Sequence, residues 1–197
     1  LAMCRAEPNI TVLYPCDAVS TERLVALAAY HPGPAYIRTS RPDAAVIYTA
    51  EDTFAIGGFK ILRQSANDAV TVVGAGVTLF EAPEAYDTLK GQGTAIRVID
   101  LYSVSPVDRE GLIACGQATR GRIVTVEDHY AAGGIGDAVS EAVGDSGIHV
   151  HRIAVREIPR SGKPDELLER YGISAKQITA RVLEVLKVPE VQEVPEV

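Results

Sequence analysis

The sequence has few cysteines, and their spacing argues against a disulfide framework or a cysteine-rich metal site. Cys4, Cys16 and Cys115 are the only three in 197 residues, and no two of them have Cys-x-x-Cys spacing. A small, odd number of cysteines is typical of proteins from a reducing compartment. We therefore expect a cytoplasmic protein in which all three cysteines are small, buried apolar groups.

Long apolar segments are also lacking. The apolar run Ala69–Leu79 is too short and too rich in glycine to cross a bilayer. The chain does not open with a basic segment followed by an apolar one and a cleavage site, so we expect no signal peptide. Leu1–Ala6 reads as the last turns of a helix that begins upstream, which predicts that the chain is a piece of a longer protein.

Clusters of lysine and arginine are absent as well. The formal net charge is −7, from 19 Lys and Arg against 26 Asp and Glu. This balance argues against a nucleic-acid partner and against an anionic membrane surface. To bind an anionic substrate, the protein would need a local basic site that overcomes the repulsion from its negative net charge.

The pattern that is present is an alternation of short apolar segments with helical segments. It predicts an α/β fold with a mostly parallel, open sheet and helices on both faces. Residues 49–58 have the composition of a linker, and Pro106 is placed to open a helix, where its missing N–H costs nothing. The last ten residues, VPEVQEVPEV, predict an extended tail. The expected strands are Ile10–Tyr14, Ala35–Thr39, Phe59–Gln64 (at an edge), Val70–Val73, Ile96–Ile99, Arg122–Val126 and Ile148–Val155, and the expected helices run from Asp17 or Ser20 to about Ala29, over Leu79–Lys90, from Pro106 onward, and over Ile135–Val143, Pro164–Tyr171 and Ser174–Leu186.

Residues 70–82, VTVVGAGVTLFEA, have part of the pattern of a dinucleotide-binding site. A strand, Gly74-x-Gly76 and a helix follow in order, and Asp100 closes the next strand. Leu79 stands where the third glycine would let the helix pack close to the strand. We favour a tight strand-to-helix turn, in which glycine supplies backbone angles that other residues resist.

The segment PRSGKP, residues 159–164, resembles a P-loop only in part. Pro164 replaces the Ser or Thr that would bind Mg²⁺, and Glu157 stands at the position of the leading glycine. A turn before a helix is the better interpretation.

Two histidines, His149 and His151, alternate on one predicted strand and therefore share a face. A metal site needs more ligands than two, and no Cys or carboxylate pair lies near them in sequence. We expect a solvent-facing or internally satisfied pair.

The segment 127–136, EDHYAAGGIG, combines two carboxylates with a glycine-rich turn. Glu127 or Asp128 at the carboxyl end of a parallel strand lies where open α/β sheets bind ligands. Gly133-Gly134-x-Gly136 at a helix N-terminus exposes backbone N–H groups that favour an anion. A carboxylate of the protein itself is another possible partner for those groups, and spacing alone leaves both alternatives open.

Two arginines follow the second predicted strand in the segment RTSRP. Arg38 and Arg41 could hold a phosphate by paired, charge-assisted hydrogen bonds. Alternatively, they pair with acids or extend over the surface. The residues alone favour neither interpretation.

Five segments taken together resemble transketolase of the animal type. They are YPCDAVSTE, YIRTSRP, VTVVGAGVTLFEA, GRIVTVEDHYAAGGIGDAVSEAV and PRSGKPDELLERYGI. Their order and approximate gaps agree with that family from Leu1 to about Lys187, and the tail lies outside the resemblance. The family transfers two-carbon ketol units between sugar phosphates, uses thiamine diphosphate and a divalent cation (Mg or Ca), and works as a homodimer with active sites between subunits.

The resemblance implies a domain organisation. Residues 1–50 would be the C-terminal part of a pyrimidine-binding domain, which is incomplete in this chain. Residues 51–58 would be a linker, residues 59–187 the transketolase C-terminal domain, and residues 188–197 an extended acidic tail.

The resemblance also implies which site residues this chain holds. The second arginine of RTSRP contacts the substrate phosphate in this family and falls on Arg41, while residues 38–40 would position it. The activating glutamate and the proton-moving histidines belong to segments upstream, and residues 144–146 depart from the Gly-Asp-Gly metal signature. We therefore expect no catalytic, cofactor-binding or metal-binding residue here, and no turnover by this chain alone. The acids of segment 127–136 would contact backbone or neighbouring chains.

Other functions remain as alternatives. One is a related thiamine-diphosphate enzyme, either a 2-oxoacid dehydrogenase β-type subunit or deoxyxylulose-phosphate synthase; RTSRP and PRSGKP favour transketolase over these. Another is an NAD-binding oxidoreductase module, against which Leu79 counts. A non-catalytic interaction domain derived from this fold is the last.

Overall fold

The larger of two β-sheets forms the centre of the C-terminal part of the chain. The computed structural model describes residues 1–41 and 43–187. In the five-stranded sheet, the order is β3-β5-β4-β7-β8; β4, β5, β7 and β8 are parallel, and β3 is an antiparallel edge strand. This confirms the predicted, mostly parallel open sheet. Its strands are β3 (Lys60–Arg63), β4 (Thr71–Gly74), β5 (Arg97–Asp100), β7 (Arg122–Tyr130) and β8 (His149–Val155).

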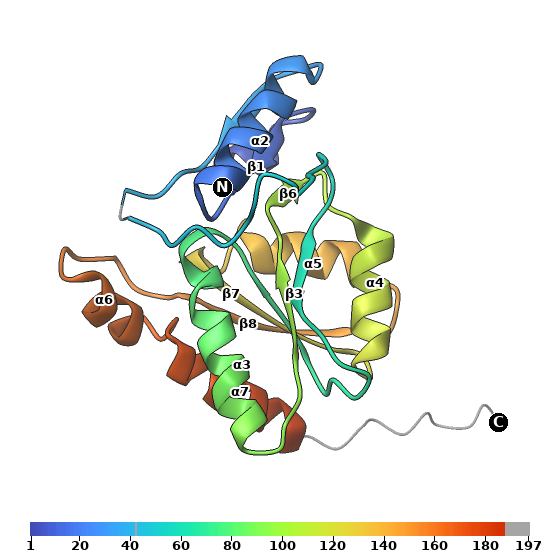
Figure 1. The fold of residues 1–197 in the computed structure, drawn as a ribbon, viewed down its shortest axis with the longest axis vertical. Helices are drawn as coiled ribbons and strands as arrows, with labels where there is room; N and C mark the ends of the chain where they lie inside the picture. Colours follow the sequence, from blue (N-terminus) through green and yellow to red (C-terminus); the bar gives the residue numbers. More distant parts are fainter. Residues whose placement is uncertain (42, 188–197) are drawn as a thin grey trace.

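Helices cover both faces of this sheet (Figure 1). Adjacent residues of one strand pack into different layers: Val72 faces one layer and Val73 the other, as expected for a strand buried on both sides. One layer contains the 3-10 helix η1 (Gly76–Leu79), α3 (Glu81–Gly91) and α7 (Ala175–Lys187), and the other contains α4 (Arg109–Ala118) and α5 (Ile135–Val143), while α6 (Pro164–Arg170) precedes α7.

A smaller sheet lies at the N-terminal end of the chain, at the top of Figure 1. Its strand order is β2-β1-β6, with β1 parallel to β2 and antiparallel to β6. Because β6 comes after β5 in the chain, its pairing with β1 joins the two sheets. The elements of this part are α1 (Ala2–Ala6), β1 (Thr11–Leu13), α2 (Ala18–Tyr30), β2 (Ala35–Ile37) and β6 (Ser103–Ser105).

Most predicted elements are confirmed to within a few residues, and two expectations need correction. Strand β6 was not predicted, because three residues are too few to show an apolar alternation. Pro106 does not lie in the first turn of α4, which begins at Arg109. The Asp108 side chain accepts a hydrogen bond from Gly111 N (2.9 Å) and so becomes the N-cap.

The first helix after β1 illustrates how local sequence sets a boundary. Asp17 is the N-cap of α2: its side chain accepts a hydrogen bond from Ser20 N (2.8 Å), and the Ser20 hydroxyl in turn accepts one from Asp17 N (3.1 Å). The other Asp17 oxygen accepts hydrogen bonds from Ile47 N and Tyr48 N. The cap therefore also fixes the end of the segment that leads from β2 toward the linker.

Asp100, the last residue of β5, connects the two parts of the molecule. It is fully buried, and its Oδ2 accepts hydrogen bonds from the Tyr48 hydroxyl (2.7 Å) and the Cys16 thiol (3.6 Å). Its Oδ1 has no hydrogen-bond partner within the described residues. Burial raises the pKa of Asp100 to about 7, although the two hydrogen bonds oppose the rise.

The cysteines agree in part with expectation. Cys16 and Cys115 are buried, whereas Cys4, in α1, is half-buried and packs at the margin of an apolar cluster. All three cysteines lie in the described part of the chain and are free thiols. Of the helices in the described ranges, none combines the length and the apolar character that a membrane crossing requires.

Substituting Asp100 should change the pH dependence of folding. Since its folded-state pKa of about 7 exceeds the ordinary 3.8, the native state binds the proton more tightly, and the resulting stability is lost as pH rises from about 4 through 7. In Asp100→Asn this loss disappears. The free energy of unfolding should then fall less between pH 5 and pH 8 than in the wild type, by roughly 2 kcal/mol.

Urea unfolding at both pH values measures this difference. Asp87→Asn makes the same change at an exposed helical position and should keep the wild-type pH dependence. An Asp100→Asn protein with an unaltered pH dependence would contradict the protonation of Asp100 in the folded state.

Candidate functional site

The two arginines of the RTSRP segment have different surroundings. Arg38, directly after β2, donates to both carboxylate oxygens of Asp128 through Nη1 (3.0 Å) and Nη2 (2.8 Å). Arg41 is exposed, and it makes no hydrogen bond or ion pair with the residues that the structure describes. The charge of Arg38 is thus neutralised within the protein, and that of Arg41 faces solvent.

A tyrosine completes the surroundings of Asp128. The hydroxyl of Tyr14, directly after β1, lies 3.0 Å from both carboxylate oxygens, and the Arg38 guanidinium carbon lies 4.6 Å from the centre of the Tyr14 ring. Burial raises the pKa of Tyr14 to about 12, and the charge of Asp128 adds to this rise. We call Tyr14, Arg38 and Asp128 the strand-end cluster. Tyr14 directly follows β1, Arg38 directly follows β2, and Asp128 lies near the end of β7.

The Tyr14 ring also explains the glycines of VTVVGAGVTLFEA. Gly76 has φ +54°, and a Cβ at this position would lie 2.0 Å from Tyr14 Cζ. Only glycine therefore lets the ring pack against the turn between β4 and η1. The predicted strand-to-helix turn is confirmed: the Tyr14 ring packs directly against Gly76, and Asp100 is fully buried.

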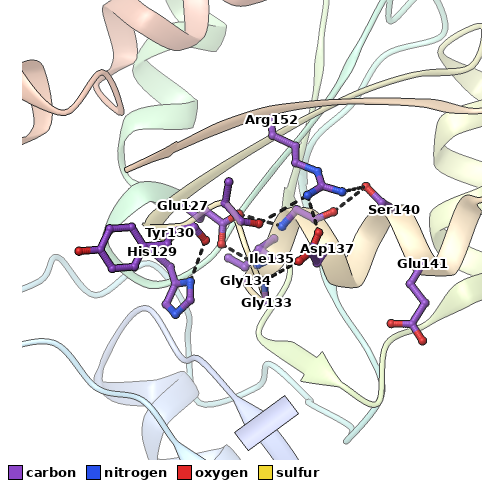
Figure 2. A network of polar contacts seen from close by, with 12 residues as sticks. Glu127, His129, Tyr130, Gly133, Gly134, Ile135, Asp137, Ser140, Glu141 and Arg152 are labelled. Carbon is purple, nitrogen blue, oxygen red and sulfur yellow. Dashed lines mark hydrogen bonds and ion pairs between the residues drawn. The ribbon is translucent and has the colours of Figure 1, made fainter. Parts of the chain in front are cut away.

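The glycine-rich start of α5 binds a carboxylate of the protein itself. Glu127 is fully buried in β7, and its Oε2 and Oε1 accept hydrogen bonds from Ile135 N (2.6 Å) and Gly136 N (2.9 Å), as Figure 2 shows. A Cβ on Gly134 would lie 1.7 Å from Glu127 Oε2, so glycine makes room for the carboxylate. Burial raises the pKa of Glu127 to about 7, and the two N–H donors oppose that rise.

A second layer of polar contacts surrounds the same turn (Figure 2). Asp137 accepts a hydrogen bond from Gly133 N and pairs with Arg152, which also donates to Ser140 Oγ (2.9 Å).

The Glu127 carboxylate therefore binds backbone N–H groups, which is one of the two predicted alternatives for this turn. Asp128 differs, since its carboxylate pairs with the side chains of Arg38 and Tyr14.

His129 follows these acids in β7. Its Nδ1 lies 2.9 Å from the Tyr130 carbonyl oxygen, and burial lowers its pKa. Among residues 1–41 and 43–187, no group of three or more His, Cys, Asp or Glu side chains is arranged to hold a metal ion. His149 is exposed and His151 half-buried, with a pKa lowered by burial.

The segment PRSGKP forms the predicted turn. Lys163 is the N-cap of α6, and Pro164 occupies the first position of the helix. The Tyr171 hydroxyl accepts a hydrogen bond from Arg160 N (2.5 Å), which ties the turn to the end of α6.

Comparison with known proteins identifies the family of this chain. The family model described as "Transketolase, C-terminal domain" matches residues 57–178. The chain belongs to the transketolase family. The match includes β3 to β8 and the surrounding helices, so it confirms the α/β fold class expected from the resemblance.

Individual transketolases and their relatives match a longer part of the chain. Transketolase-like protein 1 of Bos taurus is 56% identical over 187 residues, which are 94% of this chain and 31% of that protein. Transketolase of Homo sapiens is 50% identical over 183 residues, or 92% of this chain and 29% of that protein. The chain thus spans about three tenths of the length of these curated relatives.

A solved structure supports the same membership. A split-gene transketolase, described as an inactive beta4 tetramer, has a TM-score of 0.87 and 35% identity, over 94% of this chain and 60% of that one. The transketolase resemblance therefore extends into residues 1–56, which the family model does not cover.

Sequence reasoning missed the strand-end cluster. The sequence offered Arg38 as a phosphate ligand, as a partner of acids, as a surface side chain or, from the resemblance, as one of the residues that position Arg41. It did not identify the partner Asp128, which is 90 residues away in the chain. Tyr14 was considered only as the end of a strand. The available signal was that Arg38 and Asp128 both lie near the carboxyl ends of predicted strands, where side chains from different strands converge.

Glu127 should be more important for stability than an exposed acid of α5. Glu127→Ala leaves two buried N–H groups without an acceptor and should lower the free energy of unfolding by about 2 kcal/mol or more. The matched control is Glu141→Ala, which removes a side chain that is 82% exposed and pairs with Arg5 at the surface. Its expected cost is below about 1 kcal/mol.

Chemical denaturation of both variants measures the difference. Glu127→Gln keeps one acceptor oxygen and should fall between the wild type and Glu127→Ala. Equal costs for Glu127→Ala and Glu141→Ala would show that the carboxylate does not cap α5.

Proposed function

We propose that this chain is the C-terminal part of a transketolase, a transferase that moves two-carbon ketol units between sugar phosphates in the pentose phosphate pathway. In this proposal, Arg41 binds the substrate phosphate and the rest of the chain supports the active site. Membership in the family and 50% identity to human transketolase support the proposal. The structural observation that supports it is the exposed guanidinium of Arg41, which the described residues leave without a partner.

The chemistry of a guanidinium suits this role. Arginine presents its donors in a planar fork that matches phosphate oxygens, and it remains charged at any pH at which the enzyme would work. In a chain with a net charge of −7, such a local cation is needed to attract an anionic substrate. Arg38 cannot serve in the same way while its charge is paired with Asp128.

Thiamine diphosphate and its divalent cation, Mg or Ca, would be held by other parts of the complete enzyme. Of the two glycine-rich turns that could have received a diphosphate, Tyr14 packs against one and Glu127 binds the other. These two turns therefore do not fit the diphosphate of the cofactor. We expect the chain by itself to be inactive, and we assign it no catalytic residue.

The domain organisation of the proposal follows the two sheets. Residues 1–50 would close a pyrimidine-binding domain, residues 51–58 would link it to the next, and residues 59–187 would form the C-terminal domain. The predicted tail, residues 188–197, lies outside the described residues. The complete enzyme would be a cytoplasmic homodimer, and free thiols at all three cysteines are compatible with that compartment.

Arg41→Ala in the complete enzyme should impair the use of phosphorylated sugars selectively. Loss of a charge-assisted contact should raise KM for a phosphorylated acceptor by roughly 10- to 100-fold. The unphosphorylated sugar of the same carbon skeleton should be used almost as before, because it never makes that contact. Steady-state kinetics with the two acceptors measures the selectivity.

Arg63→Ala is the matched control, since Arg63 is also exposed and lies on the edge strand β3. It should leave both acceptors unaffected. If Arg41→Ala reduced the use of both acceptors equally, Arg41 would not be the phosphate ligand.

A further inference from the structure

The strand-end cluster is the main side-chain anchor of the segment that carries Arg41. Arg38 N donates to Leu13 O (2.9 Å), which ends the pairing of β2 with β1. From there, residues 39–41 and 43–47 contain neither helix nor strand. The next tether is at Ile47, whose N–H donates to Asp17 Oδ2 (2.9 Å). Between these two points, the side chains of Arg38 and Ser40 contact other parts of the described chain.

Of those side chains, Arg38 is part of the strand-end cluster, and Ser40 interacts with the cluster residue Tyr14. Arg38 forms a two-pronged ion pair with Asp128, and both side chains are only 24% and 21% exposed. Ser40 interacts with Tyr14 and lowers its pKa, against the larger effect of burial. Since Arg41 is three residues from Arg38, the Cα atoms of the two residues lie within about 11 Å of each other.

Asp128 belongs to the C-terminal domain, whereas Arg38 and Tyr14 belong to the N-terminal sheet. We propose that Asp128 is a positioning residue: from β7 it holds Arg38, and thereby fixes where Arg41 presents its guanidinium to the substrate phosphate. This inference rests on the proposed role of Arg41. It gives the C-terminal domain a defined task in substrate binding without any contact to the substrate.

The charge of Asp128 has a second consequence. It neutralises Arg38, so the positive charge left at this strand end is that of Arg41. Without Asp128, two guanidinium groups three residues apart would compete for one phosphate. A phosphate held by Arg38 would place the sugar in a different register, and misplacement of this kind lowers the rate of the reaction.

The test uses the complete enzyme with a phosphorylated acceptor and its unphosphorylated counterpart. Asp128→Asn keeps the shape of the side chain and removes its charge. We expect kcat/KM for the phosphorylated acceptor to fall about tenfold or more, with the unphosphorylated acceptor within about twofold of the wild type. Asp128→Glu, which restores the charge, should recover much of the loss.

Asp145→Asn is the matched control, because it removes an Asp–Arg ion pair, with Arg109 (2.6 Å), at a distant place. It should leave both acceptors unchanged. Equal losses for both acceptors in Asp128→Asn would overturn the proposal, since a merely structural contact would affect both alike. Tyr14→Phe keeps the ring and removes one hydrogen bond to Asp128, and it should give a smaller loss of the same selectivity.

Double substitution separates this inference from the role of Arg41. If Arg41 binds the phosphate and Asp128 acts through it, Asp128→Asn should add no further loss in an Arg41→Ala background. If Arg41→Ala is selective for the phosphorylated acceptor and Asp128→Asn is not, the positioning role is wrong and the proposed function stands. If Arg41→Ala is not selective, both fail.

Hydrogen exchange of the complete enzyme supplies a readout without turnover. Peptides that contain residues 38–41 should exchange faster in Asp128→Asn, while those from β4 and β5 should not change. Unchanged exchange of residues 38–41 would overturn the proposal even if activity were reduced.

Discussion

The carboxylate of Asp128 holds together three strand ends from two different sheets. It receives a two-pronged ion pair from Arg38 and a hydrogen bond from Tyr14, at distances of 2.8–3.0 Å. Because the Arg38 and Asp128 side chains are largely removed from water, each charged group is stabilised by the other in place of water. The arrangement of the N-terminal sheet on the C-terminal domain depends on this contact, on the packing of Tyr14 against Gly76 and on the pairing of β6 with β1.

The carboxyl ends of the parallel strands carry acids, and each acid is satisfied in a different way. Asp100 is held by a tyrosine and a thiol, and burial raises its pKa to about 7. Glu127 caps a helix, and Asp128 pairs with an arginine. Open α/β sheets bind ligands at this edge, but in this chain the protein's own groups occupy the positions. In the proposed function, the group that binds the ligand is Arg41, which lies in a loop outside the sheet.

The sequence was sufficient for the large sheet and insufficient for the contacts between the sheets. The strands β4, β5, β7 and β8 and the helices between them have apolar patterns long enough to be identified, and the bounds of α5 were predicted without error. Strand β6 and the start of α4 were not, since they depend on pairing with β1 and on the cap formed by Asp108. The strand-end cluster joins residues 90 to 114 positions apart, and local patterns contain no information about such distances. The role of Arg41 came from the resemblance to a family and stays a prediction.

The most direct measurement is a crystal structure of the complete enzyme with a phosphorylated sugar bound. The account predicts that the Arg41 guanidinium lies within hydrogen-bonding distance of the phosphate oxygens, while Arg38 stays paired with Asp128. A structure in which Arg38 leaves Asp128 to bind the phosphate, with Arg41 in solvent, would contradict it.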